Sequence, residues 1–405
     1  MKRSIGVVLA LLLGAAVVVA VVLGNRNDEG PGGGLVTVRG VIGSEKKPFF
    51  EDPQVRAAFA KHGLRVEVDT AGSRQIATEV KLDGYAFAFP SSLPAAEKIR
   101  KDRGVSTVFS PFYSPMAIAT FQPIADLLTK AGLVRDSGRG YPVFDVAKYL
   151  DLAAKGTRWD KLPGNTAYPA RKRVLLTTTD VRTSNSAAMY LAITSYVANG
   201  EDVVNSTGQV TGVARAVAPI FLDQGYSQAS SEAPFDDYLV MGSGKTPMVM
   251  IYEAQYLSHV FAGDGSIKPG MRLLYPSPTV LSKHTLVPLT ADGSRVGKLL
   301  TEDPGLRDLA ARYGFRTADP AAFTGLVAKS GAPAARDLVD VVEPPTYEHL
   351  EGLITNIDRL YASGAVPQQG NPGSPGRPEA TERTTERTAE KTPEEASGKA
   401  PEGVR

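Results

Sequence analysis

The segment from Leu175 to Met189 contains residue types that could bind an anion or a polar ligand. Hydroxyl and Asp side chains follow an apolar strand expected at residues 174–178, and a helix is expected to begin at Ser184-Asn185-Ser186. The first turn of a helix leaves backbone N–H groups unpaired, and the helix dipole favours negative charge there. Ser, Asn and Asp are also the usual capping residues. Taken alone, the segment predicts either an ordinary N-cap or a ligand-binding corner.

Small hydroxyl residues also follow three predicted strands in the first part of the chain. The strands are expected at residues 35–42, 64–68 and 85–89, each followed by a loop and a helix. Ser44 lies in the first loop, Ser73 in the second, and Ser91 and Ser92 in the third. Three such units predict a parallel α/β sheet, whose ligands bind at the carboxyl ends of the strands. Each serine alone also fits a turn or a cap, but their recurrence favours a shared site.

Two extended segments interrupted by prolines divide the chain. Residues 105–119 and 272–281 have prolines that suit edge or crossing strands, and a second set of helices and strands lies between them. We therefore predict two α/β domains joined by two crossings, with a cleft between them that closes by a hinge motion. The predicted limits are 35–113 with 282–364 for the discontinuous first domain, and 114–281 for the second.

Composition argues against several classes of function. A net charge of +2 is unlike that of a dedicated nucleic-acid binder. The chain has no cysteine, and its four histidines show no metal-ligand spacing, so we expect no metal and no cofactor. Gly242-Ser-Gly-Lys-Thr246 resembles the end of a phosphate-binding loop, but Leu239 stands where the motif needs glycine, and Pro247 begins a strand-like run. No catalytic residues are predicted, and we expect the protein not to be an enzyme.

The two ends of the chain differ from the rest. Two basic residues precede an apolar run over residues 5–23, which is long enough to cross a membrane core of ~30 Å. This pattern predicts an uncleaved single-pass anchor with the bulk of the chain outside the cytoplasm; a cleaved signal peptide is the alternative. A Gly-rich spacer completes residues 1–34. Residues 365–405 lack the aliphatic side chains needed for a core and are predicted to be disordered.

The chain resembles the extracytoplasmic solute-binding proteins of ABC importers, in the two-domain class that includes the molybdate-, sulfate- and phosphate-binding proteins. The resemblance covers residues 36–361. It rests on five segments: Gly43-Ser-Glu-Lys46, Thr70-Ala-Gly-Ser73, Phe89-Pro-Ser-Ser92, Thr179-Asp-Val-Arg-Thr-Ser-Asn-Ser186 and Met248-Val-Met-Ile-Tyr-Glu-Ala-Gln-Tyr256. It implies a venus-flytrap architecture of the type 2 periplasmic-binding fold. It also implies a small polar or anionic solute held by hydroxyl and backbone N–H groups, and an ABC permease as partner.

The ligand-binding residues that we expect from these patterns are Ser44, Glu45, Ser73, Ser91, Ser92, Tyr113, Thr183, Ser184, Asn185, Ser186, Tyr252 and Glu253. Two features depart from the family. Members are released by signal cleavage or tethered through a lipid on cysteine, whereas this chain has its own predicted anchor. Carboxylates near the cleft would also repel a bare anion. The alternative function is therefore a membrane-anchored interaction or sensing module on the same fold, with no transported ligand.

Overall fold

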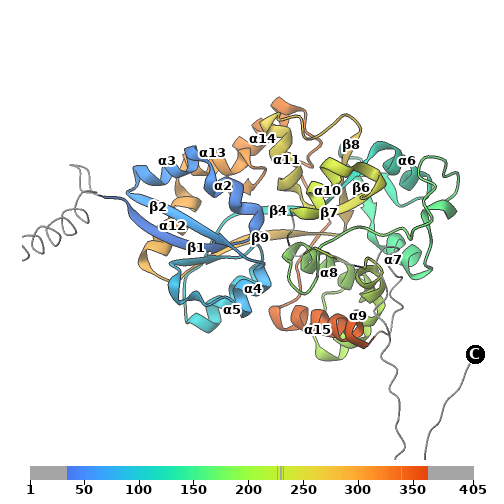
Figure 1. Ribbon diagram of the computed structural model, residues 1–405, viewed down its shortest axis with the longest axis horizontal. Helices are drawn as coiled ribbons and strands as arrows, with labels where there is room; N and C mark the ends of the chain where they lie inside the picture. The colour runs from blue at the N-terminus through green and yellow to red at the C-terminus, as the bar shows by residue number, and fades with distance from the viewer. Residues whose placement is uncertain (1–33, 226, 229, 231, 339, 364–405) are drawn as a thin grey trace, which may run out of the picture. The chain divides into compact units, whose positions relative to one another are not determined.

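The computed structural model describes residues 34–363, apart from 226, 229, 231 and 339. Within this range the strands form one hydrogen-bonded network in the order β2-β1-β3-β9-β4-β8-β6-β5, with β7 and β10 on β4 and β11 on β9. The network supports two lobes, which are connected by β4 (Phe109–Phe121) and β9 (Thr279–Pro288) (Figure 1).

The first lobe contains the three predicted strand–loop–helix units. Its parallel strands are β1 (Val36–Ile42), β2 (Leu64–Thr70) and β3 (Phe87–Phe89), with β1 in the middle. Phenylalanine, leucine and valine side chains of these strands form a core with the surrounding helices. The helices of this first cluster are α2 (Lys47–Glu51), α3 (Pro53–Lys61), α12 (Ala291–Glu302) and α13 (Pro304–Arg312). The helices α12 and α13 follow β9 in the chain, and their apolar side chains lie in the core of this lobe. The helices α4 (Ser73–Thr78) and α5 (Leu93–Arg103) pack in a second, smaller cluster of this lobe.

The second lobe is built around a buried helix, α8 (Asn185–Ala198), in which eleven residues from Asn185 to Ser195 are buried. Its strands are β5 (Val134–Asp136), β6 (Pro142–Asp145), β7 (Met248–Tyr252) and β8 (Met271–Ser277). Its other helices are α6 (Gln122–Lys130), α7 (Val146–Ala154), α9 (Thr207–Leu222), α10 (Ala233–Met241) and α11 (Glu253–Ala262). The strand expected at 174–178 is reduced to one parallel bridge, Thr177 to Val249.

The two crossing strands pair with each other and form a single antiparallel ribbon. Pro115 of β4 lies opposite Leu281 of β9. Beyond this pair, β9 continues to β3 in the first lobe, while β4 continues to β7 and β8 in the second. The first predicted crossing, residues 105–119, largely coincides with β4. The second, residues 272–281, is misplaced: it is mostly β8 of the second lobe, and the strand that crosses is β9.

The last described helix, α15 (Tyr347–Ser363), packs on the second lobe. Its apolar residues share a core cluster with α8 and α9, and these are Leu350, Leu353, Ile354 and Ile357. The domain limits remain a prediction, and that prediction assigns residues 347–363 to the first domain. In the structure, the apolar side chains of these residues pack on the second lobe. The remaining short elements are η1 (Ser44–Lys46), η2 (Leu82–Gly84), η3 (Trp159–Lys161), η4 (Gly242–Gly244), β10 (Arg316–Thr317), α14 (Ala321–Ser330) and β11 (Val341–Val342).

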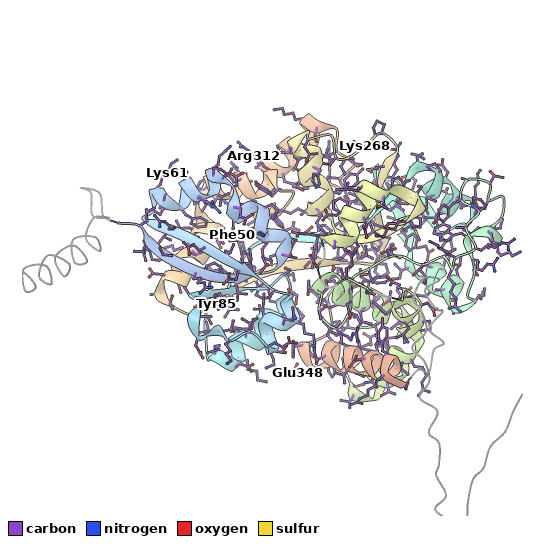
Figure 2. The ribbon with its side chains drawn as sticks, in the orientation of Figure 1. Phe50, Lys61, Tyr85, Lys268, Arg312 and Glu348 are labelled. Carbon is purple, nitrogen blue, oxygen red and sulfur yellow. The ribbon has the colours of Figure 1, made fainter. Side chains whose placement is uncertain are left out.

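Among the described helices, none has the length and apolar character needed to cross a membrane. The predicted anchor at residues 5–23 and the tail at 365–405 both lie outside the described residues. Figure 2 shows the side chains that the two lobes present, with Lys61 and Arg312 on the first lobe and Lys268 on the second.

Candidate functional site

The corner loops of the first lobe meet the N-terminus of α8 at Ser91. The backbone N–H of Ser91 donates to Ser73 Oγ (2.9 Å), and its carbonyl accepts a hydrogen bond from Asn185 Nδ2 (3.0 Å). Ser282 Oγ of β9 also donates to this carbonyl. Residues predicted from three separate strand–helix corners are therefore in direct contact, and they join the two lobes.

Asn185 is the central contact between the lobes. In addition to Ser91, its amide donates to the hydroxyl of Tyr252 (2.9 Å), at the end of β7. Both side chains are buried, and burial raises the pKa of Tyr252 well above its usual value, so the phenol stays neutral. The amide thus donates to one acceptor in each lobe, the Ser91 carbonyl in the first and the Tyr252 hydroxyl in its own, and of these two bonds only the one to Ser91 joins the lobes.

The first residues of α8 bear hydroxyls that do not cap the helix. Ser184 occupies the N-cap position, but its side chain makes no capping hydrogen bond. Instead, Ser184 Oγ lies 3.1 Å from Ser186 Oγ, which is 2.9 Å from Thr179 Oγ1. This arrangement differs from an ordinary side-chain cap, and the binding of a ligand at this corner remains a prediction.

A buried ion pair lies beside this corner. The ammonium of Lys46 is fully buried and donates to Glu45 Oε1 (2.5 Å) and Ser91 Oγ (2.7 Å), and it lies 3.2 Å from His284 Nδ1. Ser91 Oγ also donates to Glu45. Sequence reasoning identified Glu45 and Ser91 but missed Lys46 as a site residue and missed His284, which reaches the cluster from β9.

Opposing effects set the charges of this cluster. Burial alone would raise the pKa of Glu45, but the nearby Lys46 and His284, together with hydrogen bonds from Lys46 and Ser91, hold it at about 2. Burial lowers the pKa of Lys46, and the contact with Glu45 partly offsets this. Burial and Lys46 together lower the pKa of His284 to about 3, so the imidazole is neutral near pH 7. Glu45 and Lys46 thus compensate each other's charge.

The contact between Ser91 and Lys46 has the residue types of a nucleophile and a base, a pair that the sequence did not reveal. An activated serine requires a base that can accept its proton. Here the Lys46 ammonium donates to Ser91 and Glu45, and an ammonium has no free lone pair. Both Lys46 and Ser91 are also fully buried. The geometry is that of a buried, hydrogen-bonded ion pair.

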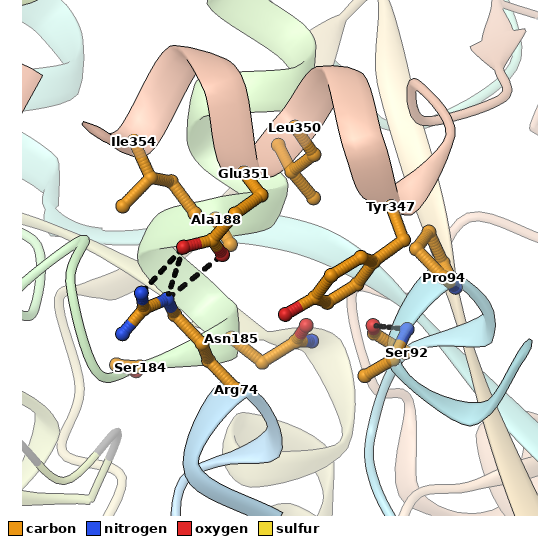
Figure 3. A pocket seen from close by; sticks show the side chains of 11 residues that line it. Arg74, Ser92, Pro94, Ser184, Asn185, Ala188, Tyr347, Leu350, Glu351 and Ile354 are labelled. Carbon is orange, nitrogen blue, oxygen red and sulfur yellow. Dashed lines mark hydrogen bonds and ion pairs between the residues drawn. The ribbon is translucent and has the colours of Figure 1, made fainter. Parts of the chain in front are cut away.

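The corner loops of the two lobes touch closely. A side chain at Gly72 would place its Cβ 2.2 Å from the carbonyl oxygen of Thr183. The pocket between Arg74, Asn185 and α15 has about 20 Å³ of free volume, which accommodates about one water molecule (Figure 3). The structure therefore shows the lobes in a closed arrangement.

Several predicted ligand contacts have other partners in this arrangement. Ser92 caps α5 by accepting from the Ala95 N–H (3.2 Å). Both carboxylate oxygens of Glu253 are used by Arg316 (2.7 and 2.8 Å), and one also accepts from Tyr275. These contacts explain the burial of Ser92 and Glu253 by structural roles, and their binding of a ligand remains a prediction.

Ser44 and Tyr113 have partners other than Ser91 and Asn185. Ser44 Oγ is 3.5 Å from Ser230 Oγ in the loop before α10, and Tyr113 is half-buried in β4 opposite Lys283. Among the residues that the structure describes, no group of His, Asp and Glu could hold a metal ion.

No protein-family model and no curated protein matches the sequence. Solved structures match over most of the chain, and the fold they share is that of periplasmic binding proteins. A periplasmic thiamin binding protein is 11% identical, with a TM-score of 0.54, over 81% of this chain and 96% of its own. A ferric binding protein from Campylobacter jejuni is 9% identical, with a TM-score of 0.50, over 80% and 98%.

The periplasmic binding protein AfuA from Actinobacillus pleuropneumoniae, with fructose-6-phosphate bound, is also similar. It is 10% identical, with a TM-score of 0.50, over 81% of this chain and 97% of its own. These three neighbours are binding proteins and not enzymes. Their likeness confirms the mixed α/β fold of periplasmic binding proteins for this chain.

Proposed function

We propose that this protein is an extracytoplasmic solute-binding protein that captures a small polar or anionic solute between its lobes for an ABC importer. The observation that carries the proposal is the polar corner at the N-terminus of α8, where Ser184 and Ser186 lie at the junction of two lobes that share one hinge ribbon. Unpaired N–H groups in the first turn of a helix bind anionic and polar oxygens. The shared fold of periplasmic binding proteins supports the same interpretation.

The buried charges next to the corner bear on the class of solute. An isolated Glu45 would repel an anion, but its carboxylate is compensated by Lys46 at 2.5 Å. The corner consequently neither repels an anion strongly nor attracts one through a free cation. Recognition by hydroxyl and N–H donors suits a solute with several oxygen acceptors, such as an oxyanion, a sugar or the carboxylate of a zwitterion.

Binding requires the lobes to separate. The pocket between Arg74, Asn185 and α15 holds about 20 Å³, so a solute larger than one water molecule can bind there only if this pocket widens. Rotation about the ribbon of β4 and β9 would break the contact of Asn185 with Ser91 and expose the α8 corner. The solute would then take up the hydrogen bonds that these groups make to each other.

The test is a binding screen with matched serine variants. We expect native mass spectrometry of the full chain, purified gently from its host, to show a bound solute, and that solute to raise the melting temperature when added back. We expect Ser184→Ala/Ser186→Ala to weaken its affinity at least tenfold. Ser206→Ala is the control, since Ser206 is an N-cap of α9 that likewise makes no capping bond. Equal affinity of the double variant and the wild type would refute the site.

One observation favours the alternative of a membrane-anchored interaction module without a transported ligand: the lobes are held in contact by their own side chains. With no cysteine in the sequence, Arg74→Cys/Glu351→Cys can be joined by a short bismaleimide to lock the cleft shut. A solute-binding protein would lose uptake of its solute when locked. An interaction module would still retain its membrane partner, and no solute in a panel of oxyanions, amino acids and sugars would stabilise it.

The location outside the cytoplasm is part of the proposal, because it rests on the apolar run at residues 5–23. N-terminal sequencing of the protein extracted from its host membrane distinguishes the two forms. An intact N-terminus in the membrane fraction supports the single-pass anchor. A new N-terminus near residue 24 in the soluble fraction supports a cleaved signal peptide.

A further inference from the structure

The helix α15 is fixed to the second lobe. Its apolar residues lie in the same core cluster as those of α8 and α9, and the hydroxyl of Tyr361 donates to the carbonyl of Phe221 in α9 (3.0 Å). The guanidinium of Arg182, in the loop before α8, lies 4.8 Å from the centre of the Tyr361 ring. When the lobes rotate about β4 and β9, α15 therefore moves with the second lobe.

Another face of α15 contacts the first lobe. The carboxylate of Glu351 accepts from Arg74 Nε at 2.9 and 3.1 Å, and also from Arg74 Nη2. Figure 3 shows this pair between α4 and α15. The side chains of Arg74 and Glu351 are 29% and 25% exposed, so they are only partly screened by solvent. Two-point pairing of Arg with a carboxylate is among the stronger side-chain hydrogen-bond arrangements.

Arg74 contacts the second lobe in a second way. Its Nη1 donates to the carbonyl of Arg182 (3.1 Å). On the first lobe α5 adds two weaker contacts to the start of α15: Lys98 Nζ lies 5.8 Å from the ring centre of Tyr347, and Lys101 Nζ lies 4.0 Å from Glu348. All of these contacts join the first lobe to elements that move with the second.

We propose that α15 is a latch, that is, a helix that holds the two lobes closed in the absence of a solute. Its main contact with the first lobe is the Arg74–Glu351 ion pair. Opening must break this pair, because Arg74 stays with the first lobe and Glu351 leaves with the second. The latch acts on the closed population whether or not a solute binds, so its test is independent of the proposed function. Any solute must bind to the molecules that are open at a given time, and the latch sets the size of that open fraction.

The experiment measures the distance between the lobes in the full chain. Spin labels at Lys81→Cys in the first lobe and Ala216→Cys in the second occupy exposed positions, and the sequence has no other cysteine. Pulsed electron spin resonance then gives the closed and open populations. We expect Glu351→Gln to lower the closed-to-open ratio by about tenfold, as for a partly buried, two-point ion pair.

Two controls make the result specific. Asp160→Asn breaks a similar two-point pair, with Arg158 (2.8 and 2.6 Å), that lies wholly within the second lobe, and it should leave the distance unchanged. The exchange Arg74→Glu/Glu351→Arg restores an ion pair across the lobes and should recover the closed population. A distance distribution for Glu351→Gln that matches the wild type, or an effect of Asp160→Asn of equal size, would overturn the latch.

Discussion

Replacing Lys46 by methionine tests how the buried charges beside the candidate site are held. The ammonium is fully buried and is the nearest cation to Glu45. Methionine preserves the length of the side chain but leaves a carboxylate buried without its counter-ion. Removal of one partner from a buried ion pair destabilises proteins by about 3–5 kcal/mol. Because the substitution also removes the cost of burying the Lys46 ammonium, we expect a loss of unfolding free energy near the lower end of this range, about 3 kcal/mol.

The pH dependence gives an independent measure of the same quantity. Although burial would raise it, the pKa of Glu45 is held at about 2, below its usual value. Each pKa unit corresponds to about 1.4 kcal/mol, so ionised Glu45 contributes about 3 kcal/mol above pH 4.5, and this is lost as the pH falls towards 2. Without Lys46 that contribution disappears, and the difference in stability between wild type and variant should shrink in acid.

Urea unfolding provides the assay, followed by circular dichroism and by the fluorescence of Trp159, the one tryptophan in the chain. With an m-value of about 3 kcal/mol/M, Lys46→Met should lower the midpoint by about 1 M at pH 7. The double variant Glu45→Gln/Lys46→Met removes both charges and should recover most of this loss. An unchanged midpoint in the single variant, or a double variant less stable than the single one, would refute the account of a charge-compensated pair.

Three further predictions concern the hinge and the cleft. Gly72→Ala places a Cβ 2.2 Å from the Thr183 carbonyl oxygen and should shift the lobes towards the open form. X-ray scattering should then give a larger radius of gyration. Gly84→Ala is the control, because Gly84 has open space around it, and it should leave the radius of gyration unchanged. Burial and Lys46 lower the pKa of His284 to about 3, so the melting temperature should fall as the pH drops below about 6.5, and His284→Asn should flatten this dependence. Glu253→Gln leaves Arg316 buried without a counter-ion and should cost about 3 kcal/mol in urea unfolding; a loss below about 1 kcal/mol would contradict the buried pair.

The sequence predicted the elements that are determined locally. Alternating apolar residues, interrupted by Gly and Pro, located the three strands of the first lobe and the crossing strand β4. The segment predicted as the second crossing is mostly β8, and the crossing strand is β9. The same Gly and Pro positions placed Ser73 and Ser91 in loops after strands and Asn185 at a helix N-terminus. In the structure, Ser91 contacts both Ser73 and Asn185. Parallel α/β topology brings such positions to one edge, so their convergence could be inferred without coordinates.

The residues that the sequence missed depend on distant pairing. His284 lies 238 positions from Lys46, and Glu351 lies 277 positions from Arg74. On a predicted helix, charged residues such as Arg74 and Glu351 indicate only a solvent-facing side, since ion pairs between helices leave no periodic signal. The run of apolar and β-branched residues at 174–178 led us to predict a strand where the structure has one bridge. Local β propensity does not specify whether a partner strand continues alongside such a run.

The discontinuous first lobe has a consequence for biosynthesis. Its sheet is completed by β9, and its helical cover by α12 and α13, all of which follow the whole of β5 to β8 in the chain. Domains generally fold as units, with the N-terminal one first, as the chain emerges from the ribosome or the translocation channel. Here β1, β2 and β3 emerge first but must wait for partners that are made near the end, so the second lobe can complete its sheet before the first. A chain stopped before residue 279 would therefore lack a finished N-terminal lobe.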